Sequence, residues 1–481
     1  MNNRQEKNKS LFRNIVLFFL ASFVPKTISF FMVPLYTFCL TTEEYGVVDL
    51  LHTTVQLALP FFTLQIQDAM LRFSMDDETD PSDVLSVGLR IIVSGGILLS
   101  FITVLVTMSG WLDLPWSYVC FFLVSYFLSA IKNITTYFCR GIEEIKTVTL
   151  ANVAVTLTTV VCNLVFLLGF KWGVNAYLFA LAMGNFSGIA IIFFKAKLIR
   201  YIKFVPGNTA LQKTIIAFSV PMVFSALSWW LNTSLDKYIL RFFEGTAAVG
   251  LFSVAYKIPT ILSLFGVTFA NAYSISVIKD LDVEDRDGFL GKSYSTIFAF
   301  FAMGCSGLMI LNLPLAKILF AKDFFVAWKY VPMLLVAAVV SQMSLVCEQY
   351  YVAIKKTKII SATALVGAGV NLAGNLILIP LYSGAGAAIA TILSFGTAWM
   401  LRYLCLKRFV AIKDSAVRDA ALFFGLLIQM WLACFGNKFL AYQICVFVVL
   451  MLLSRKELLG VISFGADALG KLNVLNRKRA R

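Results

Sequence analysis

Between Arg13 and Glu43 the sequence reads NIVLFFLASFVPKTISFFMVPLYTFCLTT (residues 14–42), an apolar run whose only charge is Lys26. About 20 apolar residues are enough for a helix to span a membrane. A signal peptide has an apolar core of about 7–15 residues, so this run is too long to be one. We therefore predict a first membrane-spanning helix here.

The composition of the whole chain extends this prediction to a polytopic, all-α membrane protein. Of its 481 residues, 59% are hydrophobic and only 14% are charged, whereas soluble domains carry roughly 25% charged residues. About 14 apolar segments are long enough to span a membrane, and the connections between them are short. The predicted spans are 12–40, 46–73, 84–108, 116–139, 147–169, 174–194, 212–240, 247–278, 291–311, 327–352, 359–379, 384–406, 417–435 and 438–454.

The net charge of +15 is interpreted as membrane topology rather than as affinity for nucleic acid. Lys and Arg collect in the cytoplasmic loops of membrane proteins. With the N-terminus inside, about 29 basic residues lie inside, about six outside and about six within spans. We therefore predict that both termini are cytoplasmic, and we expect no nucleic-acid partner.

Several kinds of site are excluded by the residues that the chain lacks. It has nine scattered cysteines, no CxxC pair, and one histidine, His52, so neither a disulfide framework nor a zinc site is expected. No GxxxxGK[ST] sequence is present, which argues against ATP hydrolysis by this chain. We predict no metal and no cofactor.

The two halves of the sequence resemble each other. IEEIKTVTLAN (142–152) matches IKKTKIISATA (354–364), and at the same offset Asn163 falls on Asn375. Chance similarity between apolar segments is the alternative, but the matched blocks also share hydrophilic positions, so we favour a repeat. Six spans separate equivalent helices, which gives both halves the same orientation, as in transporters that enclose a central site.

The repeat divides the chain into three parts. A first lobe of six spans covers residues 1–205, and a second lobe of six spans covers residues 206–410. Residues 411–481 add two spans and a basic tail. The expected fold is two six-helix lobes related by a parallel pseudo-two-fold axis, with two extra C-terminal helices.

Polar side chains form stripes along several predicted spans, although a charge at the centre of a span costs roughly 2.5–3.5 kcal/mol or more. Surfaces that face lipid are not built in this way. We therefore predict that the stripes line one water-filled cavity between the lobes. The candidate cavity residues are Lys26, Arg72, Arg90, Lys132, Lys257, Ser22, Ser29, Gln56, Asn232 and Asn271.

The charges of these stripes allow two interpretations. Mutual neutralisation is one, for example of Asp68 with Arg72, or of Asp236 with its neighbour Lys237. Lys26 and Lys257 have no acidic residue within one helical turn, so for them we favour an anion-binding role. The candidates for ion coupling are Asp49, His52, Asp236 and Glu348, although a histidine such as His52 is more often a satisfied polar residue than a proton carrier.

At this point the chain resembles a Wzx-type polysaccharide or oligosaccharide flippase of the multidrug/oligosaccharidyl-lipid/polysaccharide (MOP) exporter superfamily. The resemblance covers about residues 10–410 and includes the pairs Tyr45-Gly46, Arg72-Phe73 and Tyr256-Lys257. It is carried by TTEEYGVVDLL (41–51), IQDAMLRFSMDD (66–77), LDKYILRFFEGTAAVGLFSVAYKI (235–258) and LPLAKILFAKDFFVAWKYVPMLL (313–335).

The resemblance implies alternating access in a bacterial cytoplasmic membrane. It implies that a polyprenyl-pyrophosphate-linked oligosaccharide moves from the cytoplasmic to the outer leaflet, for the biosynthesis of O-antigen, capsule or exopolysaccharide. It also implies a polysaccharide polymerase and glycosyltransferases as partners. Related lipid II flippases carry basic residues in the first and eighth helices, where Lys26 and Lys257 stand here.

Three other functions are alternatives to the flippase. A non-transporting scaffold would not need the charged stripes. A cation-coupled drug or metabolite antiporter of the same superfamily would need a cavity dominated by carboxylates, whereas the deeper charges here are mostly basic. A membrane sugar polymerase or transferase would need a sizeable outer loop or a paired-carboxylate site, and the sequence indicates neither. We therefore predict a transporter and not an enzyme.

Overall fold

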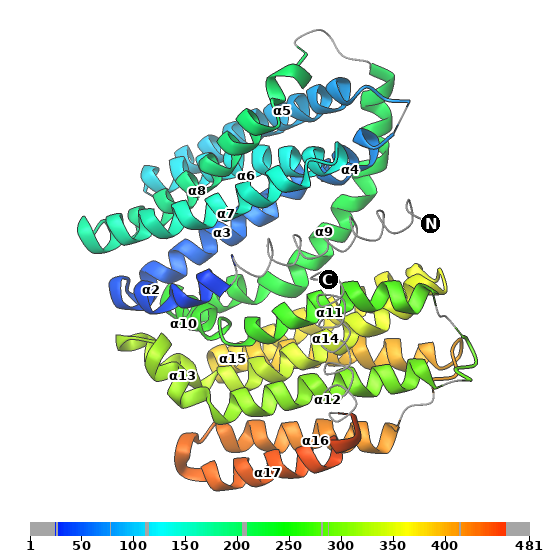
Figure 1. The fold of residues 1–481 in the computed structure, drawn as a ribbon. Helices are drawn as coiled ribbons and strands as arrows, with labels where there is room; N and C mark the ends of the chain where they lie inside the picture. Colours follow the sequence, from blue (N-terminus) through cyan, green and yellow to red (C-terminus); the bar gives the residue numbers. More distant parts are fainter. Residues whose placement is uncertain are drawn as a thin grey trace, which may run out of the picture. The chain divides into compact units, whose positions relative to one another are not determined.

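The structure is a computed structural model that describes residue 25 and residues 27–76, 78–110, 115–203, 209–279, 282–286, 288–412 and 415–457. Ser22 and Lys26 therefore lie outside the described residues. The side chains at 267–268, 271–272, 274–276 and 278–279 are not described either, and Asn271 is among them. All regular elements in the described ranges are helices (Figure 1), which confirms the all-α prediction.

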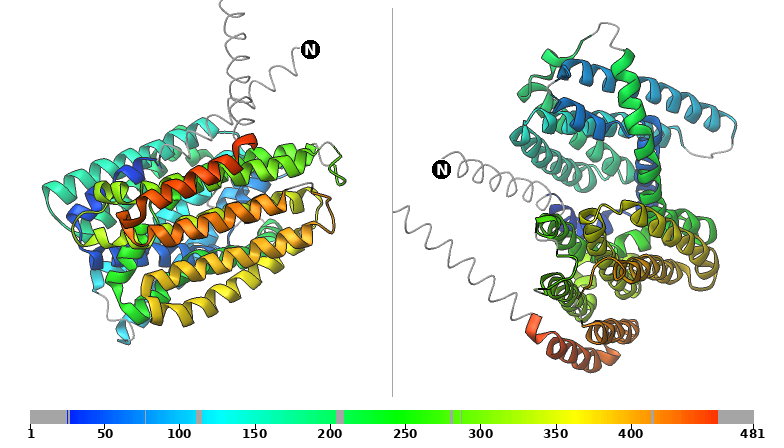
Figure 2. Two further views of the ribbon diagram at one scale, coloured as in Figure 1. Left: turned by 90° about the horizontal axis from the view of Figure 1, so that it is seen from below. Right: turned by 90° about the vertical axis from the view of Figure 1, so that its right-hand side faces the viewer.

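The chain divides into two compact units, residues 1–250 (the N-terminal unit) and 251–481 (the C-terminal unit). Within the N-terminal unit, α7 packs along α8, and α6 contacts both α5 and α8 (Figure 1, Figure 2). The helices that begin in this unit are α2 (Val33–Cys39), α3 (Thr42–Phe62), α4 (Gln67–Ser74), α5 (Pro81–Met108), α6 (Trp116–Gly141), α7 (Ile145–Asn163) with its π-helical extension η1 (Leu164–Gly169), α8 (Val174–Lys195), η2 (Leu198–Tyr201), α9 (Thr209–Glu244) and α10 (Thr246–Ala255).

Within the C-terminal unit, α14 is the most buried of the candidate membrane spans. Helices α16 and α17 lie side by side and pack against α12 (Figure 1, Figure 2). The helices of this unit are α11 (Pro259–Lys279), α12 (Phe289–Ile310), α13 (Asn312–Leu319), η3 (Lys322–Lys329), α14 (Val331–Ala353), α15 (Thr357–Leu406), α16 (Ala416–Ala433), η4 (Gly436–Phe439) and α17 (Leu440–Leu453).

The helices are long enough for a multi-pass membrane protein. Among the residues that the structure describes, ten helices could cross a membrane, or up to twelve if each of two bent pairs counts as one span. The 50-residue α15 contains a kink at Ser383, which falls between the predicted spans 359–379 and 384–406. Because the first predicted span is described only in part, the total of 14 stays a prediction. The lobe boundary near residue 205 also stays a prediction, although α9 packs against α3 and α4.

Two predicted spans are bent within their length. Helices α3 and α4 meet at 52°, and α10 meets the first part of α11 at 52°. At the first break Leu64 and Gln65 both have φ of 52°. Pro60 lies just before this break and has no N–H to donate. At the second break Pro259 disfavours helical backbone in the residue before it.

The same backbone geometry recurs in corresponding turns of the two halves, at equivalent positions in the first turn and one residue away from the aligned position in the second. Glu143 and Lys355 have φ of 62° and 59°, and in each turn the next N–H reaches a carbonyl five residues back, at 2.8 and 2.9 Å. Gly173 has φ, ψ of 58°, −131°, and Ser383 has 51°, −134°. These matching turns support the internal repeat.

Candidate functional site

A cavity of about 250 Å³ lies within the N-terminal unit, between α3, α6, α7 and α8. Apolar side chains form the rest of its wall, and the lining includes no carboxylate. A group that enters would therefore meet one ammonium, one imidazole, hydroxyls and amides. The polar lining residues are His52, Gln56, Ser125, Ser129, Lys132, Asn133, Thr159 and Asn185.

Helix α6 contributes half of the polar lining residues. Ser125, Ser129 and Lys132 follow one another at spacings of four and three residues, which places them on one face of the helix. The Asn185 amide on α8 lies opposite and donates to Ser129 Oγ at 3.5 Å. The Thr159 hydroxyl donates to its own helix at Val155 O, 2.7 Å away, so its lone pairs remain available as acceptors.

Lys132 is the cation of the cavity. Its stem passes Gly188 on α8, where an added Cβ would lie 4.0 Å from Lys132 Cε. Within the described ranges, its ammonium group makes no hydrogen bond or ion pair with another side chain. An unpaired charge in a low-dielectric region is costly, so water or an anionic ligand is needed to stabilise it there.

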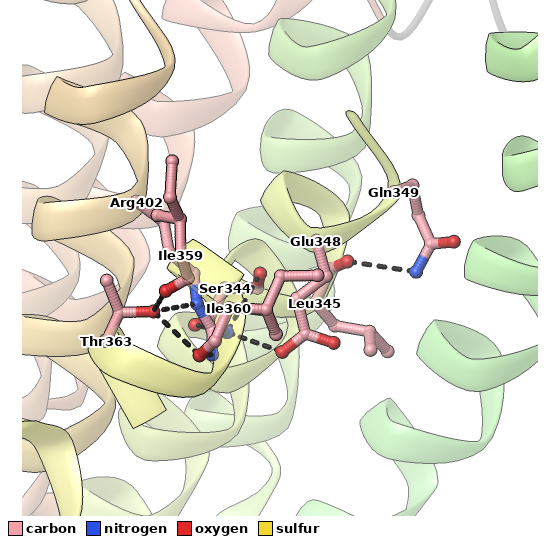
Figure 3. A network of polar contacts seen from close by, with 8 residues as sticks. All are labelled: Ser344, Leu345, Glu348, Gln349, Ile359, Ile360, Thr363 and Arg402. Carbon is pink, nitrogen blue, oxygen red and sulfur yellow. Dashed lines mark hydrogen bonds and ion pairs between the residues drawn. The ribbon is translucent and has the colours of Figure 1, made fainter. Parts of the chain in front are cut away.

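The C-terminal unit contains a cation in the opposite situation (Figure 3). Arg402 on α15 is 4% exposed and is surrounded by α14 and by the start of α15. Its Nη1 lies 2.5 Å from Glu348 Oε1 and 2.7 Å from Ser344 Oγ. Its Nε donates to Thr363 Oγ1 at 2.8 Å. Its Nη2 donates to Ile360 O at 3.2 Å, so all three guanidinium nitrogens are hydrogen-bonded and Glu348 is held as the counter-ion.

The two cations can be compared through the repeat. Ser344 follows Lys132 by the same 212 residues that separate the two matching turns. At this position the first half carries a lysine without a described partner, and the second half carries a serine that binds a neutralised arginine. At this position of the repeat, only the N-terminal unit carries a cation.

The acidic candidates of the N-terminal unit lie outside the cavity, between α3 and α9. Asp49 Oδ2 lies 2.7 Å from Lys237 Nζ. The Lys237 ammonium thus forms its ion pair with Asp49 and not with its neighbour Asp236, because adjacent side chains on a helix point in different directions. Asp236 is 3% exposed and instead accepts the backbone N–H of Lys237 at 2.9 Å.

Four more predicted residues also lie outside the cavity lining. Lys257 is half-buried between α10 and α11, and Ser29 is exposed in the helical stretch 27–39. Asn232 donates to Ser228 O at 2.9 Å. Arg90 Nε donates to its own helix, at 3.3 Å from Ser86 O.

Arg72 on α4 is exposed and likewise does not line the cavity. The predicted pair of Asp68 with Arg72 is not formed in the described part of the chain. Asp68 instead accepts from Gln65 Nε2 at 3.3 Å.

The cavity thus brings together His52, Gln56 and Lys132 from the predicted site, with Ser125 and Ser129 on the same face of α6 as Lys132. Sequence reasoning missed Asn133, Thr159 and Asn185. The signal for Asn185 was an amide inside an otherwise apolar span. No group of three potential metal ligands occurs among the residues that the structure describes.

The sequence model of a family described as "polysaccharide biosynthesis protein" matches residues 11–280, more than half of the chain. The chain belongs to this family. It is therefore a flippase-type transporter of the MOP superfamily and not an enzyme. No curated protein matches the chain.

Solved structures of MOP transporters share the fold. The lipid II flippase MurJ, in an inward closed conformation, is 14% identical with a TM-score of 0.72, over 94% of this chain and 100% of that one. An inward-facing multidrug resistance MATE transporter is 14% identical with a TM-score of 0.58, over 86% and 95%. A MOP transporter from Pyrococcus furiosus, described as having a binding pocket of reverse polarity, is 14% identical with a TM-score of 0.58, over 85% and 96%.

Proposed function

We propose that this protein is a Wzx-type flippase that moves a polyprenyl-pyrophosphate-linked oligosaccharide from the cytoplasmic to the outer leaflet by alternating access. The observation that carries the proposal is the cavity of the N-terminal unit, where Lys132 has no described counter-ion and no carboxylate lines the wall. A cavity with this charge selects an anion.

The chemistry of the wall fits the headgroup of such a lipid. An ammonium group binds phosphate oxygens through charge-assisted hydrogen bonds. Amides such as Asn133 and Asn185, with the hydroxyls of α6, can hydrogen-bond sugar hydroxyls. A volume of about 250 Å³ is smaller than a typical ligand pocket of about 300–1,000 Å³. It suits one part of the headgroup, while the polyprenyl tail stays in the bilayer.

The same observations argue against a cation antiporter. A cation-binding cavity needs a carboxylate, but Asp49 is paired with Lys237 and Glu348 with Arg402, and neither carboxylate lines the cavity. The proposal places the protein in a bacterial cytoplasmic membrane with both termini inside. There it would work beside the glycosyltransferases and polymerase that build and extend the oligosaccharide.

Leaflet exchange in proteoliposomes tests the proposal. The cargo is a fluorescent polyprenyl-pyrophosphate sugar, and the variants are Lys132→Met and Lys132→Arg. Because a hydrogen bond to a charged group contributes about 1.5–3 kcal/mol, we expect exchange to slow about tenfold to a hundredfold in Lys132→Met. The Lys132→Arg protein should keep most of its activity.

The matched control is Lys195→Met, which removes an exposed lysine at the end of α8 and should leave exchange unchanged. Normal exchange in a folded Lys132→Met protein would refute the cavity assignment. Uptake of a lipophilic cation driven by a proton gradient, without lipid exchange, would favour the antiporter. The same assay on Lys26→Ala and Lys257→Ala tests the pair predicted from the sequence.

A further inference from the structure

Two turns of the C-terminal unit together form an exposed basic surface. The first turn, 354–358, joins α14 to α15, and the second, 407–412, follows α15. Lys356 Nζ lies 3.4 Å from the centre of the Phe409 ring, so the two turns are in contact. The basic surface consists of Lys355, Lys356, Lys358, Lys407 and Arg408, all of them exposed.

The basic surface lies where spanning helices end. Helices α14 and α15 are both long and apolar enough to cross a membrane. Because α15 kinks at Ser383, its two halves run in opposite directions. The turn before α15 and the turn after it therefore lie at the same end of the helices. Lys407 lies 4.5 Å from the centre of the Tyr403 ring. Aromatic and basic side chains at the ends of spans are typical of the headgroup layer.

The fold itself does not require lysines here. The equivalent turn of the N-terminal unit has the same backbone, with φ of 62° at Glu143 against 59° at Lys355. That turn carries Glu143 and Glu144 where the C-terminal unit carries Lys355 and Lys356. An even number of spans separates the two turns, so both lie on the same side of the membrane. Topology therefore does not account for the difference in charge.

The acidic side chains next to the basic surface already have partners. Ala411 donates to Val283 O at 2.8 Å, which brings the loop 282–286 alongside. In that loop Glu284 pairs with Arg286 at 2.7 Å. Asp285 is buried and accepts two backbone N–H groups at the start of α12, both at 2.9 Å. Asp282 accepts the backbone N–H groups of Glu284 and Arg286 at 3.1 and 2.8 Å. Asp282 and Asp285 keep their negative charges, but the five basic residues outnumber them, so the basic surface keeps a net positive charge against the described part of this loop.

We propose that the basic surface binds the phosphate groups of anionic phospholipids. Charge complementarity and position at the headgroup layer both favour a lipid over an acidic protein segment. Each basic residue near an anionic membrane surface strengthens binding by about fivefold, so the five residues act together. Site occupancy should fall as ionic strength rises, since these charges are exposed.

Lipid titration of the full-length protein in neutral detergent, followed by native mass spectrometry, tests this proposal. The probes are phosphatidylglycerol and phosphatidylcholine. We expect phosphatidylglycerol to bind at least tenfold more tightly than phosphatidylcholine. In Lys355→Glu/Lys356→Glu, which copies the acidic turn of the N-terminal unit, this preference should fall by roughly tenfold or more.

The matched control is Lys195→Glu/Lys197→Glu, which makes the same change in net charge at two exposed lysines of the N-terminal unit. It should keep the preference. The proposal is overturned if wild-type protein does not discriminate between the lipids, or if both double variants weaken binding equally. It is also overturned if Lys355→Glu/Lys356→Glu leaves the preference for phosphatidylglycerol unchanged. That result is expected if the basic surface binds an acidic protein segment instead of a lipid. If that variant fails to fold, Lys358→Gln/Arg408→Gln replaces it, with the same expected loss.

Discussion

Lys132 and Arg402 show how a single cation serves either binding or stability, depending on its neighbours. Arg402 makes hydrogen bonds to Glu348, Ser344 and Thr363, so its charge is used within the protein. Lys132 faces a cavity wall without carboxylates, so its charge is available to a ligand. The polar stripe on α6 predicted Lys132. Arg402 and Glu348 are 54 residues apart in the sequence and lie on different helices. Helical spacing within one span cannot predict such a partner.

Removing one partner of the buried ion pair should destabilise the protein. In Glu348→Gln the guanidinium of Arg402 stays buried without its counter-ion, which typically costs about 3–5 kcal/mol. We expect a lower Tm in thermal unfolding of the purified protein. The double variant Glu348→Gln/Arg402→Gln should recover part of the loss, whereas Lys132→Met should lose no stability. Equal destabilisation by Glu348→Gln and Lys132→Met would contradict this distinction.

A second ion pair gives a pH prediction outside the spans. Lys203 Nζ lies 2.7 Å from Asp80 and 2.8 Å from Asp83. The hydrogen bond from Lys203 lowers the pKa of the Asp80 carboxyl, and the same bond raises the pKa of Lys203. The unfolded carboxyl has a pKa of about 3.9. Stabilisation by Asp80 is therefore complete above that pH and is lost as the pH falls through the lower folded value.

Amide hydrogen exchange at the turn 198–203 measures this effect. Protection relative to the rest of α5 and α8 should be retained from neutral pH to about pH 4 and should decrease in stronger acid. Asp80→Asn should show the weaker protection already at neutral pH. The same protection in Asp80→Asn and wild type would mean that the pair does not hold the turn.

At the scale of helices, the sequence predicted the apolar segments but not their bends. Apolar length determines whether a segment spans, and nearly all predicted spans have a helix in the structure. The break at Leu64 and Gln65 has neither Gly nor Pro at its centre, so local composition did not mark it. It is accommodated by packing, because Gly95 on α5 lies against the backbone of Phe62. The break before Pro259 did have a local signal.

Helices α3 and α10 approach each other at two glycines, Gly46 and Gly250. A Cβ on Gly46 would stand well within 3.0 Å of Thr246 O, and one on Gly250 would stand equally close to Thr42 O. We expect Gly46→Ala and Gly250→Ala each to lower the free energy of unfolding by about 1–3 kcal/mol, the usual cost of overpacking.

The matched control for this pair is Gly369→Ala in α15, where an added Cβ meets nothing within 4 Å. It should leave stability unchanged or raise it by roughly 0.5–1 kcal/mol, since Ala favours a helix over Gly. Thermal unfolding of the three variants measures these changes in stability. Similar effects at all three glycines would show that helix propensity, rather than the close contact, is measured.

The kink of α15 stores backbone strain. Ser383 has φ of 51° and ψ of −134°, a conformation that residues with a Cβ rarely adopt. Its counterpart at the start of α8 is Gly173, with nearly the same angles. We expect Ser383→Gly to raise the free energy of unfolding by about 1 kcal/mol. A loss of stability in thermal unfolding would show instead that the Ser383 side chain makes a contact worth more than this strain.

For the whole molecule, the repeat was predictable because corresponding turns recur in the two halves of the chain. The αL residues Glu143 and Lys355 recur although their charges are opposite, so backbone geometry is shared more widely than side-chain chemistry. The cavity was only partly predictable. Stripes on α3 and α6 show which faces are polar, but the contribution of α7 and α8 depends on close packing at Gly184 and Gly188. Such packing is a property of helix pairs, not of one helix.

The proposed cargo makes transport sensitive to membrane potential. A pyrophosphate headgroup is negatively charged, and an inside-negative potential of 100 mV favours its outward movement by about 2.3 kcal/mol per charge. Exchange from the inner to the outer leaflet should therefore accelerate in proteoliposomes with an inside-negative potassium diffusion potential. The full gain corresponds to about fiftyfold per net charge moved, and a several-fold increase is expected because Lys132 offsets part of the headgroup charge.

Two controls make this measurement decisive. The ionophore without a potassium gradient should leave the rate unchanged, and a neutral fluorescent lipid should not respond to the potential. In Lys132→Met the residual exchange should respond more steeply, because more uncompensated charge moves with each cargo molecule. A rate that is independent of potential in wild-type protein would mean that another ion balances the headgroup. Uncoupled movement of an anionic lipid would then be ruled out, and coupling through a carboxylate such as Asp49 or Asp236 would become the better hypothesis.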